Sequence, residues 1–181
     1  MKILLFGVSN VGKTTIGKLL AEKLKFPFYD LDEEIKKYYG ITLEEFVHTE
    51  NLRWRDQKRG HIIKKILKLD EDMVFVITPI SYTYNFEERI VADDILLIEL
   101  CDSPENIFSR LVFSDEEDNI YTDVLYKNEH KEYYINEIKE DIHWYEQIFK
   151  KIGVKNKFTI DNDEPEKAVN RLIKEYGLLV R

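Results

Sequence analysis

The sequence predicts an α/β protein in which a parallel sheet of five strands is flanked by helices. Three observations lead to this prediction. Short apolar runs alternate with segments of helical period, a glycine-containing loop joins the first run to the first helix, and the central runs are apolar throughout. Strands that alternate with helices favour a parallel sheet covered on both faces. Continuous apolar runs are typical of strands buried on both faces.

The first strand, loop and helix form a phosphate-binding motif. The strand at 2–6 is followed by "GVSNVGKTT" and by a helix at 13–25 with apolar residues at helical spacing. Gly-x-x-x-x-Gly-Lys-Thr is the phosphate-loop pattern, whose backbone N–H groups surround phosphates and whose Thr hydroxyl ligates Mg²⁺. We therefore expect a P-loop NTPase that binds a nucleoside triphosphate with Mg²⁺. The expected nucleotide contacts are Gly7, Ser9, Asn10, Val11, Gly12, Lys13, Thr14 and Thr15.

The rest of the chain continues the alternation. A short strand at 27–29 ends in Asp-Leu-Asp, and further apolar strands are predicted at 73–78, 94–100 and 157–160. A polar stretch at about 112–129 shows no clear period. The remaining predicted helices span about 32–39, 42–48, 51–69, 104–111 and 130–151, and a last helix begins near Pro165. A proline at that position costs nothing, because the first helical N–H has no partner.

Three separated segments are predicted to meet at one edge of the sheet. The Gly7 loop, Asp30 with Asp32, and the segment that begins at Thr78 each follow a predicted strand. Ligands of open parallel sheets bind at the carboxyl ends of the strands. We therefore expect these segments to line one cleft.

Length and composition limit the class of protein. The 181 residues predict a single domain covering 1–181, and the net charge of −8 argues against nucleic-acid binding, which needs basic residues. No apolar run approaches the ~20 residues of a membrane span. The single cysteine, Cys101, fits a reducing compartment. We expect a cytoplasmic monomer that binds neither nucleic acid nor membrane.

The motifs together resemble the shikimate kinase family over nearly the whole length. The resemblance rests on "GKTTIGKLLAEKLKFPFYDLDEEI", on Gly40, on "ILLIEL" with "SPENIFSR", and on the closing Pro165-Glu-Lys-Ala-Val. It implies a nucleoside-monophosphate-kinase-like fold with acceptor-binding helices at about 32–69 and a lid at about 112–129. It also implies transfer of the γ-phosphate of ATP to the hydroxyl of a small metabolite, with Mg²⁺.

Residue roles follow from the same resemblance. Lys13 would bind the transferring phosphate, Thr14 and Asp30 would hold Mg²⁺, and Asp32 would accept a hydrogen bond from the acceptor hydroxyl; Lys13 and Asp32 are thus the candidate catalytic residues. Phosphoryl transfer needs positioning and positive charge, and an aspartate can orient the attacking hydroxyl. Either aspartate could instead cap the following helix. Arg110 and Pro165 would lie near the nucleotide.

The acceptor half departs from the family pattern. The family carries Gly-Glu-x-x-Phe-Arg here, and Trp54-Arg55 matches its end with a one-residue deletion, so Arg55 is the expected acceptor contact and Arg53 the alternative. Thr78 and Pro79, also expected to contact the acceptor, stand with Ile80 where the family has three glycines. The run Arg55, Lys58, Arg59 could attract an anion, although such a run is by default a solvated helix face.

The lid and the long helix depart as well. No arginine occurs between Arg110 and Arg171, so the lid lacks the family's arginine, and Lys127 and Lys131 are the nearest cations. Asp141 falls near the position of a second acceptor-binding arginine. Lysine and aspartate do not reproduce bidentate recognition of a carboxylate. We expect a kinase whose acceptor is not shikimate. The alternatives are a shikimate kinase with a rearranged site and a non-catalytic ATP-binding regulatory module.

Overall fold

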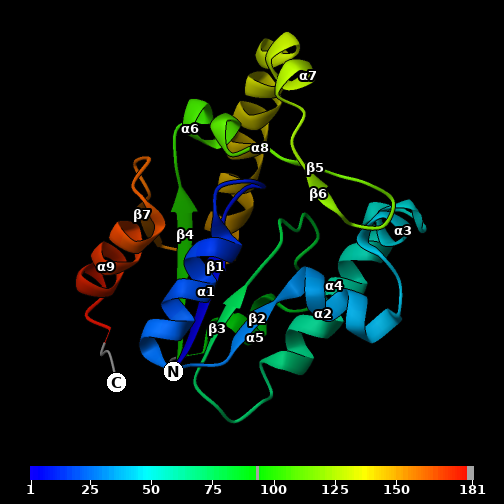
Figure 1. The fold of residues 1–181 in the computed structure, drawn as a ribbon. Helices are drawn as coiled ribbons and strands as arrows, with labels where there is room; N and C mark the ends of the chain where they lie inside the picture. The colour runs from blue at the N-terminus through cyan, green and yellow to red at the C-terminus, as the bar shows by residue number, and fades with distance from the viewer. Residues whose placement is uncertain (93, 179–181) are drawn as a thin grey trace.

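The protein is built on the predicted parallel sheet (Figure 1). The computed structural model describes residues 1–92 and 94–178. All neighbouring strands of the sheet are parallel, and their order is β2-β3-β1-β4-β7. The strands are β1 (Lys2–Phe6), β2 (Phe28–Asp30), β3 (Met73–Val76), β4 (Ile95–Cys101) and β7 (Asn156–Thr159). The fold class is therefore as predicted.

Helices cover both faces of the sheet and divide the core into two layers. Ile3 and Leu5 of β1 pack on one side with α1 (Lys13–Leu24) and α9 (Pro165–Glu175). Leu4 and Phe6 point to the other side. That second layer is closed by α4 (Leu52–Ile66), α5 (Glu87–Ile90) and α8 (Lys131–Lys151). This double burial explains why the strands are apolar at every position.

The register of the strands brings four segments to one edge of the sheet. Near the end of β1, Leu5 lies beside Val76 of β3 and Ile98 of β4. The chain therefore leaves β1, β2, β3 and β4 on the same side, as is usual for ligand sites in such sheets. The phosphate loop, the start of α2 (Leu31–Tyr39), Thr78 and Asp102 follow these strands.

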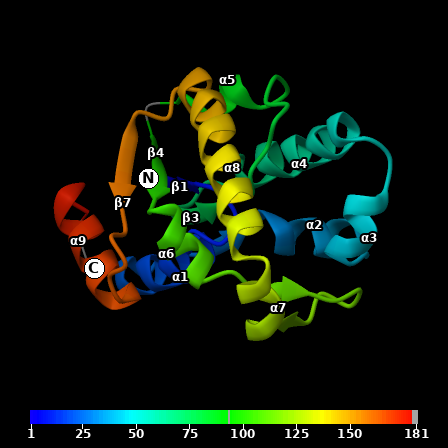
Figure 2. The same ribbon diagram turned by 90° about the horizontal axis from the view of Figure 1, so that it is seen from above.

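Two appendages flank this edge (Figures 1 and 2). One is formed by α2, α3 (Leu43–His48) and α4, at the right of both views. The other is the lid, a hairpin that reaches from the β4–α6 side of the molecule toward α3. Its elements, after α6 (Pro104–Ser109), are β5 (Phe113–Ser114), β6 (Ile120–Tyr121) and α7 (Val124–Glu129).

The observed elements differ from the predicted ones mainly at their ends. The predicted strand 73–78 ends at Val76, and the predicted helix 51–69 covers Leu52–Ile66. The short helix α5 was not predicted. The largest difference is in the polar stretch 112–129, which is folded. Asp115 Oδ1 accepts hydrogen bonds from the backbone N–H groups of Glu117 and Asn119, both at 2.9 Å, and so closes the turn of the hairpin.

Among the helices of residues 1–92 and 94–178, none has the combined length and hydropathy of a membrane-spanning segment.

Candidate functional site

The phosphate loop encloses the amine of Lys13. Gly7 has φ +144°, and a Cβ atom on it would lie 2.7 Å from the carbonyl oxygen of Leu100, so only glycine fits there. In this turn the Lys13 Nζ donates to the carbonyl oxygens of Gly7 at 2.9 Å and Val8 at 2.8 Å. The loop therefore holds a cation at the N-terminus of α1, where backbone N–H groups and the helix dipole also attract anions.

The pKa of Lys13 is lowered to about 8, because burial disfavours its charged form. The carboxylates of Asp32 and Asp30 act in the opposite direction. The two carboxylates offset only part of the cost of burying the charged amine. A multiply charged anion beside the amine would therefore stabilise its charged form further. The loop is thus electrostatically prepared for phosphate.

Thr14, Asp30 and Asp32 lie together, as the sequence predicts. Thr14 Oγ1 donates to Asp30 Oδ2 at 2.8 Å, and the backbone N–H of Asp32 donates to Asp30 Oδ1 at 3.1 Å. Asp30 is therefore the N-cap of α2 as well as the partner of Thr14. The capping role belongs to Asp30, which leaves the carboxylate of Asp32 available to the cleft.

The pKa of Asp32 is raised, chiefly by burial. A hydrogen bond from Thr78 and the positive charges of Arg59 and Lys13 oppose this rise, while Asp30 adds to it. Thr78, expected to contact the acceptor, thus lies beside Asp32. A carboxylate with a raised pKa between two cations can orient a hydroxyl and take its proton.

Beside the loop is a cavity of about 270 Å³ that could hold a nucleotide base. Arg110 forms one wall, and its Nη2 is fixed by Asp102 Oδ2 at 2.6 Å. Burial disfavours the charged form of Asp102, but hydrogen bonds from Asn106, Arg110 and the Ser103 backbone hold its pKa below the usual range. The lining residues are Gly12, Thr15, Ile16, Arg110, Ile160, Asn162, Asp163, Glu164 and Pro165. This cavity therefore brings together three of the expected nucleotide contacts, Thr15, Arg110 and Pro165.

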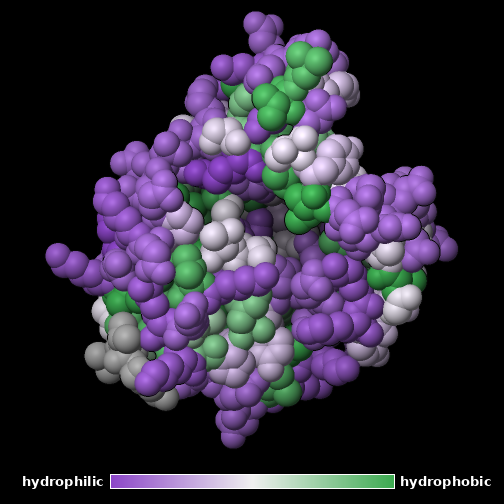
Figure 3. All heavy atoms as spheres, viewed as in Figure 1, coloured by the Kyte–Doolittle hydropathy of each residue, from purple (hydrophilic) through white to green (hydrophobic). Residues whose placement is uncertain are grey.

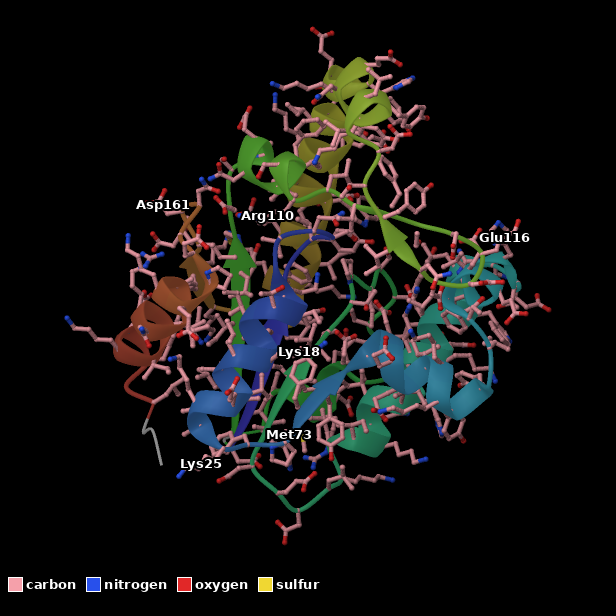
Figure 4. The ribbon with its side chains drawn as sticks, viewed as in Figure 1. Lys18, Lys25, Met73, Arg110, Glu116 and Asp161 are labelled. Atoms are coloured by element: carbon pink, nitrogen blue, oxygen red, sulfur yellow. The ribbon has the colours of Figure 1, made fainter. Side chains whose placement is uncertain are left out.

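A second cavity of about 540 Å³ lies over the phosphate loop and beneath the lid. It is lined by Asn10, Gly12, Lys13, Thr14, Thr15, Arg110, Val112 and Ile120. Gly12, Thr15 and Arg110 border both cavities. Figure 3 shows the molecule hollowed between lid and sheet edge, and Figure 4 shows Arg110 above the loop. Of the other expected loop contacts, Val11 is buried in the core and Ser9 is exposed.

Arg59 lies close enough for its charge to act on Asp32, and its burial corrects the default interpretation of a solvated helix face. Its side chain is 9% exposed, and its Nη1 donates to Asp56 Oδ1 at 2.8 Å. The guanidinium lies 5.2 Å from the ring of Phe46. Among the described residues its Nε has no hydrogen-bond partner. Spacing could have revealed this, because Asp56 and Arg59 share the helix face of the buried Ile63.

The two arginines that the sequence analysis favoured have other partners. Arg55 Nη1 donates to the carbonyl oxygens of Thr49 at 3.1 Å and Glu50 at 2.9 Å, just after the end of α3. Arg53 is exposed and lies 5.6 Å from the ring of Tyr84. No described contact brings either one to Asp32. Arg55 instead ties α4 to the end of α3.

The segment after β3 is fixed against α4 rather than left open as a glycine loop. The backbone N–H groups of Ser81 and Tyr82 both donate to Asp56 Oδ2 at 3.0 Å. Ile80 is buried in the core, while Pro79 is partly exposed at the edge of the cleft. Asp56 therefore holds both Arg59 and this loop in place.

Lys127 and Asp141 lie near the lid, where the family has arginines. Lys127 Nζ donates to the carbonyl oxygens of Ser109 at 2.9 Å and Leu111 at 3.1 Å, so it fastens the base of the lid. Asp141 is exposed on α8, and its pKa is raised first by burial and then by Glu137 and Glu140. The charge of Lys127 is thus held by carbonyl oxygens at the base of the lid, and Asp141 adds a negative charge.

Comparison with known proteins agrees with this geometry. The sequence profile of the family described as Shikimate kinase matches residues 9–176. A shikimate kinase from Caldicellulosiruptor saccharolyticus is 34% identical over 112 residues, which cover 60% of this chain and 63% of that protein. The match thus spans less than two thirds of the relative's length.

Two solved structures share the fold over almost the whole chain. Shikimate kinase from Bacteroides thetaiotaomicron has a TM-score of 0.76 at 21% identity, covering 98% of this chain and 99% of that one. Shikimate kinase from Acinetobacter baumannii in complex with shikimate has a TM-score of 0.70 at 19% identity, covering 98% and 95%. At these identities the likeness establishes the fold. Because the profile spans nearly the whole sequence, the chain belongs to the shikimate kinase family.

Proposed function

We propose that this protein is an ATP- and Mg²⁺-dependent kinase that transfers the γ-phosphate of ATP to a hydroxyl group of a small metabolite. The observation that carries the proposal is the convergence of Lys13, Thr14, Asp30 and Asp32 at the end of two parallel strands. These residues place a cation, a pair of oxygen ligands and a candidate base close together at this edge of the sheet. Phosphoryl transfer requires this kind of positioning more than covalent chemistry.

The oxygen atoms of Thr14 and Asp30 fit Mg²⁺. Their hydroxyl and carboxylate lie 2.8 Å apart, and both are hard oxygen ligands. The described residues contain no group of three or more His, Cys, Asp or Glu side chains that could hold a metal by themselves. That suits Mg²⁺, which is usually held by one or two protein oxygens, substrate phosphates and waters. When bound, the ion neutralises charge on the phosphates.

The nucleotide and the acceptor would occupy opposite sides of Lys13. The base would lie against Arg110 and Pro165, and the phosphates would lie in the loop with Lys13 Nζ facing the group transferred. Asp32 would accept the hydrogen bond of the acceptor hydroxyl and take its proton as the bond to phosphorus forms. The raised pKa of Asp32 supports this role.

Arg59 supports an acceptor that carries a negative or strongly polar group. Its positive charge acts on the carboxyl group of Asp32 and opposes the rise in the pKa of that group. An arginine held by Asp56 offers its remaining N–H groups in a fixed fork. We also propose that residues 1–181 form a single kinase domain that acts as a monomer.

Shikimate itself is the second candidate acceptor. Membership of the family and a buried arginine beside Asp32 favour it. The loop at Pro79 and the acidic residue Asp141 favour a different hydroxylated compound, since neither matches the family's acceptor contacts. The choice between these acceptors is open to direct measurement.

Acceptor-dependent ADP release tests the proposal. Purified protein would be given ATP·Mg²⁺ with shikimate and then with a panel of small hydroxylated acids and polyols, beside the variant Lys13→Met. Release that depends on an acceptor and disappears in the variant supports the kinase. Tight ATP binding with no turnover across the panel contradicts it and favours the regulatory module.

A further inference from the structure

The lid is a preformed unit that ends in an aspartate. The ring of Phe113 lies 5.8 to 5.9 Å from the rings of Tyr121, Tyr126 and Tyr134, so the lid has a small aromatic core that is shared with the start of α8. The turn closed by Asp115 sets the backbone of Asp118 at φ +62°, a conformation that aspartate tolerates better than most residues. The tip can therefore present the Asp118 carboxylate in a defined direction.

That carboxylate completes the N-terminus of α3. Asp118 Oδ2 accepts from the backbone N–H of Leu43 at 2.7 Å, and Oδ1 accepts from that of Glu44 at 3.3 Å. The next N–H, of Glu45, is capped by Thr42 within the same segment. Helices leave their first N–H groups without intrahelical partners. Two of those of α3 are thus satisfied by a residue from the lid, across 74 and 75 positions of sequence.

The contact is partly buried and electrostatically assisted. The side chain of Asp118 is 13% exposed, and Lys36 Nζ lies 3.9 Å from its Oδ2. Figure 1 shows the hairpin reaching across to α3, and Figure 4 places Glu116 at the same end of the lid. A charged acceptor makes stronger hydrogen bonds than a neutral one. The lid is therefore held down on the acceptor side of the cleft.

Packing against α3 and then the charge of Arg59 connect this point with the acceptor site. Phe46, within α3, is buried, and the guanidinium of Arg59 lies 5.2 Å from its ring. The positive charge of Arg59 in turn opposes the rise that burial causes in the pKa of Asp32. On the nucleotide side, Val112 and Ile120 of the lid line the cavity over the phosphate loop. A lid held at α3 thus places apolar side chains over the cavity of the phosphate loop while it contacts the helix that supports Arg59.

We propose that Asp118 is a positioning residue that closes the lid through α3, in a lid that carries no arginine to be drawn down by the phosphates. Closure then responds to the acceptor-binding helices as well as to the nucleotide, and it excludes water from the transferring phosphate. The kinetic part of this proposal rests on the proposed function, whereas the contact itself does not.

Hydrogen exchange of the Leu43 and Glu44 amides tests the contact in the free protein. In Asp118→Ala these amides should exchange on the order of tenfold faster, because each loses a hydrogen bond to a charged group. Glu116→Ala is the matched control, since Glu116 is exposed on the same hairpin and has no described hydrogen bond. Unchanged protection in Asp118→Ala, with the fold retained, overturns the proposal even if no acceptor is ever found.

The kinetic arm separates positioning from a purely structural role. With an active acceptor, Asp118→Ala should raise the acceptor KM on the order of tenfold and increase acceptor-independent ATP hydrolysis, while Asp118→Asn should be intermediate because its amide keeps one acceptor oxygen. Faster amide exchange with an unchanged KM and unchanged hydrolysis overturns the coupling to the acceptor. If the wild-type protein shows no turnover with any acceptor, that result instead counts against the kinase proposal.

Discussion

The nucleotide side and the acceptor side of the cleft are built in different ways. On the nucleotide side, Lys13, Thr14 and Asp30 are held by hydrogen bonds within the β1–loop–α1 unit and to the end of β2, the next strand along the chain. On the acceptor side, Arg59 is positioned by Asp56, and Asp56 also holds a loop 25 residues away. The first side depends on local spacing, and the second on contacts between distant segments. Local spacing is easily conserved in a motif, whereas distant contacts can be exchanged for others.

This difference explains what the sequence could predict. The pattern from Gly7 to Thr14 fixes its own geometry, so Lys13 lies within the loop and Thr14 lies beside Asp30. Their roles toward phosphate and Mg²⁺ stay predictions. The sheet was equally accessible, because strands buried on both faces are apolar throughout. The hairpin inside the lid was missed, although Asp115 and Asn119 are residues that commonly close turns.

The acceptor contact was harder to predict for a physical reason. Alignment to a motif pointed to Arg55, but that side chain bonds to carbonyl oxygens at the end of α3. Which arginine enters the cleft depends on which face of α4 is buried. That face carries Asp56, Arg59 and Ile63, and a charged pair on an apolar stripe was the signal that motif alignment overlooked.

The largest expected effect comes from removing the cation of the nucleotide side. Lys13→Met should lower turnover on the order of 10³-fold, because it removes charge stabilisation of the transferring phosphate. Its stability should not fall, because burial already disfavours the charged amine. The exposed Lys18→Met on the same helix is the control for activity and for thermal unfolding. If Lys13→Met were as active as Lys18→Met, Lys13 would have no special role on the nucleotide side of the cleft.

The next effect is expected on the acceptor side. Arg59→Lys keeps the charge beside Asp56 but loses the guanidinium fork, so kcat/KM for the acceptor should fall about 10- to 100-fold. The control is Arg53→Lys, which changes an exposed residue beside Tyr84. Steady-state kinetics with varied acceptor would show the difference. A larger loss in Arg53→Lys would restore the alternative that motif alignment left open.

The pH profile should have limbs from both sides of the cleft. As pH rises through about 8, free Lys13 loses its charge, so kcat/KM for ATP should fall at alkaline pH. As pH falls, Asp32 becomes protonated earlier than an ordinary aspartate, because its pKa is raised, and turnover should fall with it. Stability should rise with pH between about 8 and 10.5, where the unfolded chain binds the extra proton on Lys13. An alkaline limb that persists in Lys13→Met would exclude Lys13 as its source.

The smallest effect concerns the packing of the segment after β3 against α4. A Cβ atom on Gly60 would lie 2.2 to 2.6 Å from side-chain atoms of Asn85, so Gly60→Ala must displace Asn85 and break its hydrogen bond to the Gln57 carbonyl oxygen. The cost of about 1–3 kcal/mol is partly offset by the higher helix propensity of alanine, about 1 kcal/mol. Denaturant unfolding should therefore show a net loss of roughly 1 kcal/mol.

The double variant Gly60→Ala with Asn85→Ala controls for this interpretation. It removes the clash together with the side chain, so its stability should recover relative to Gly60→Ala alone. A further loss in the double variant would show that Asn85 is not what limits the space at Gly60.

If the two sides of the cleft are independent, a change on the acceptor side leaves ATP binding unchanged. Calorimetric titration with ATP·Mg²⁺ tests this independence most directly. Wild type, Lys13→Met and Arg59→Lys would be compared in the absence of acceptor. We expect Arg59→Lys to bind ATP within about twofold of wild type and Lys13→Met to bind on the order of tenfold more weakly. If Arg59→Lys weakened ATP binding as much as Lys13→Met, the two sides would form one interdependent site, and the account would be contradicted.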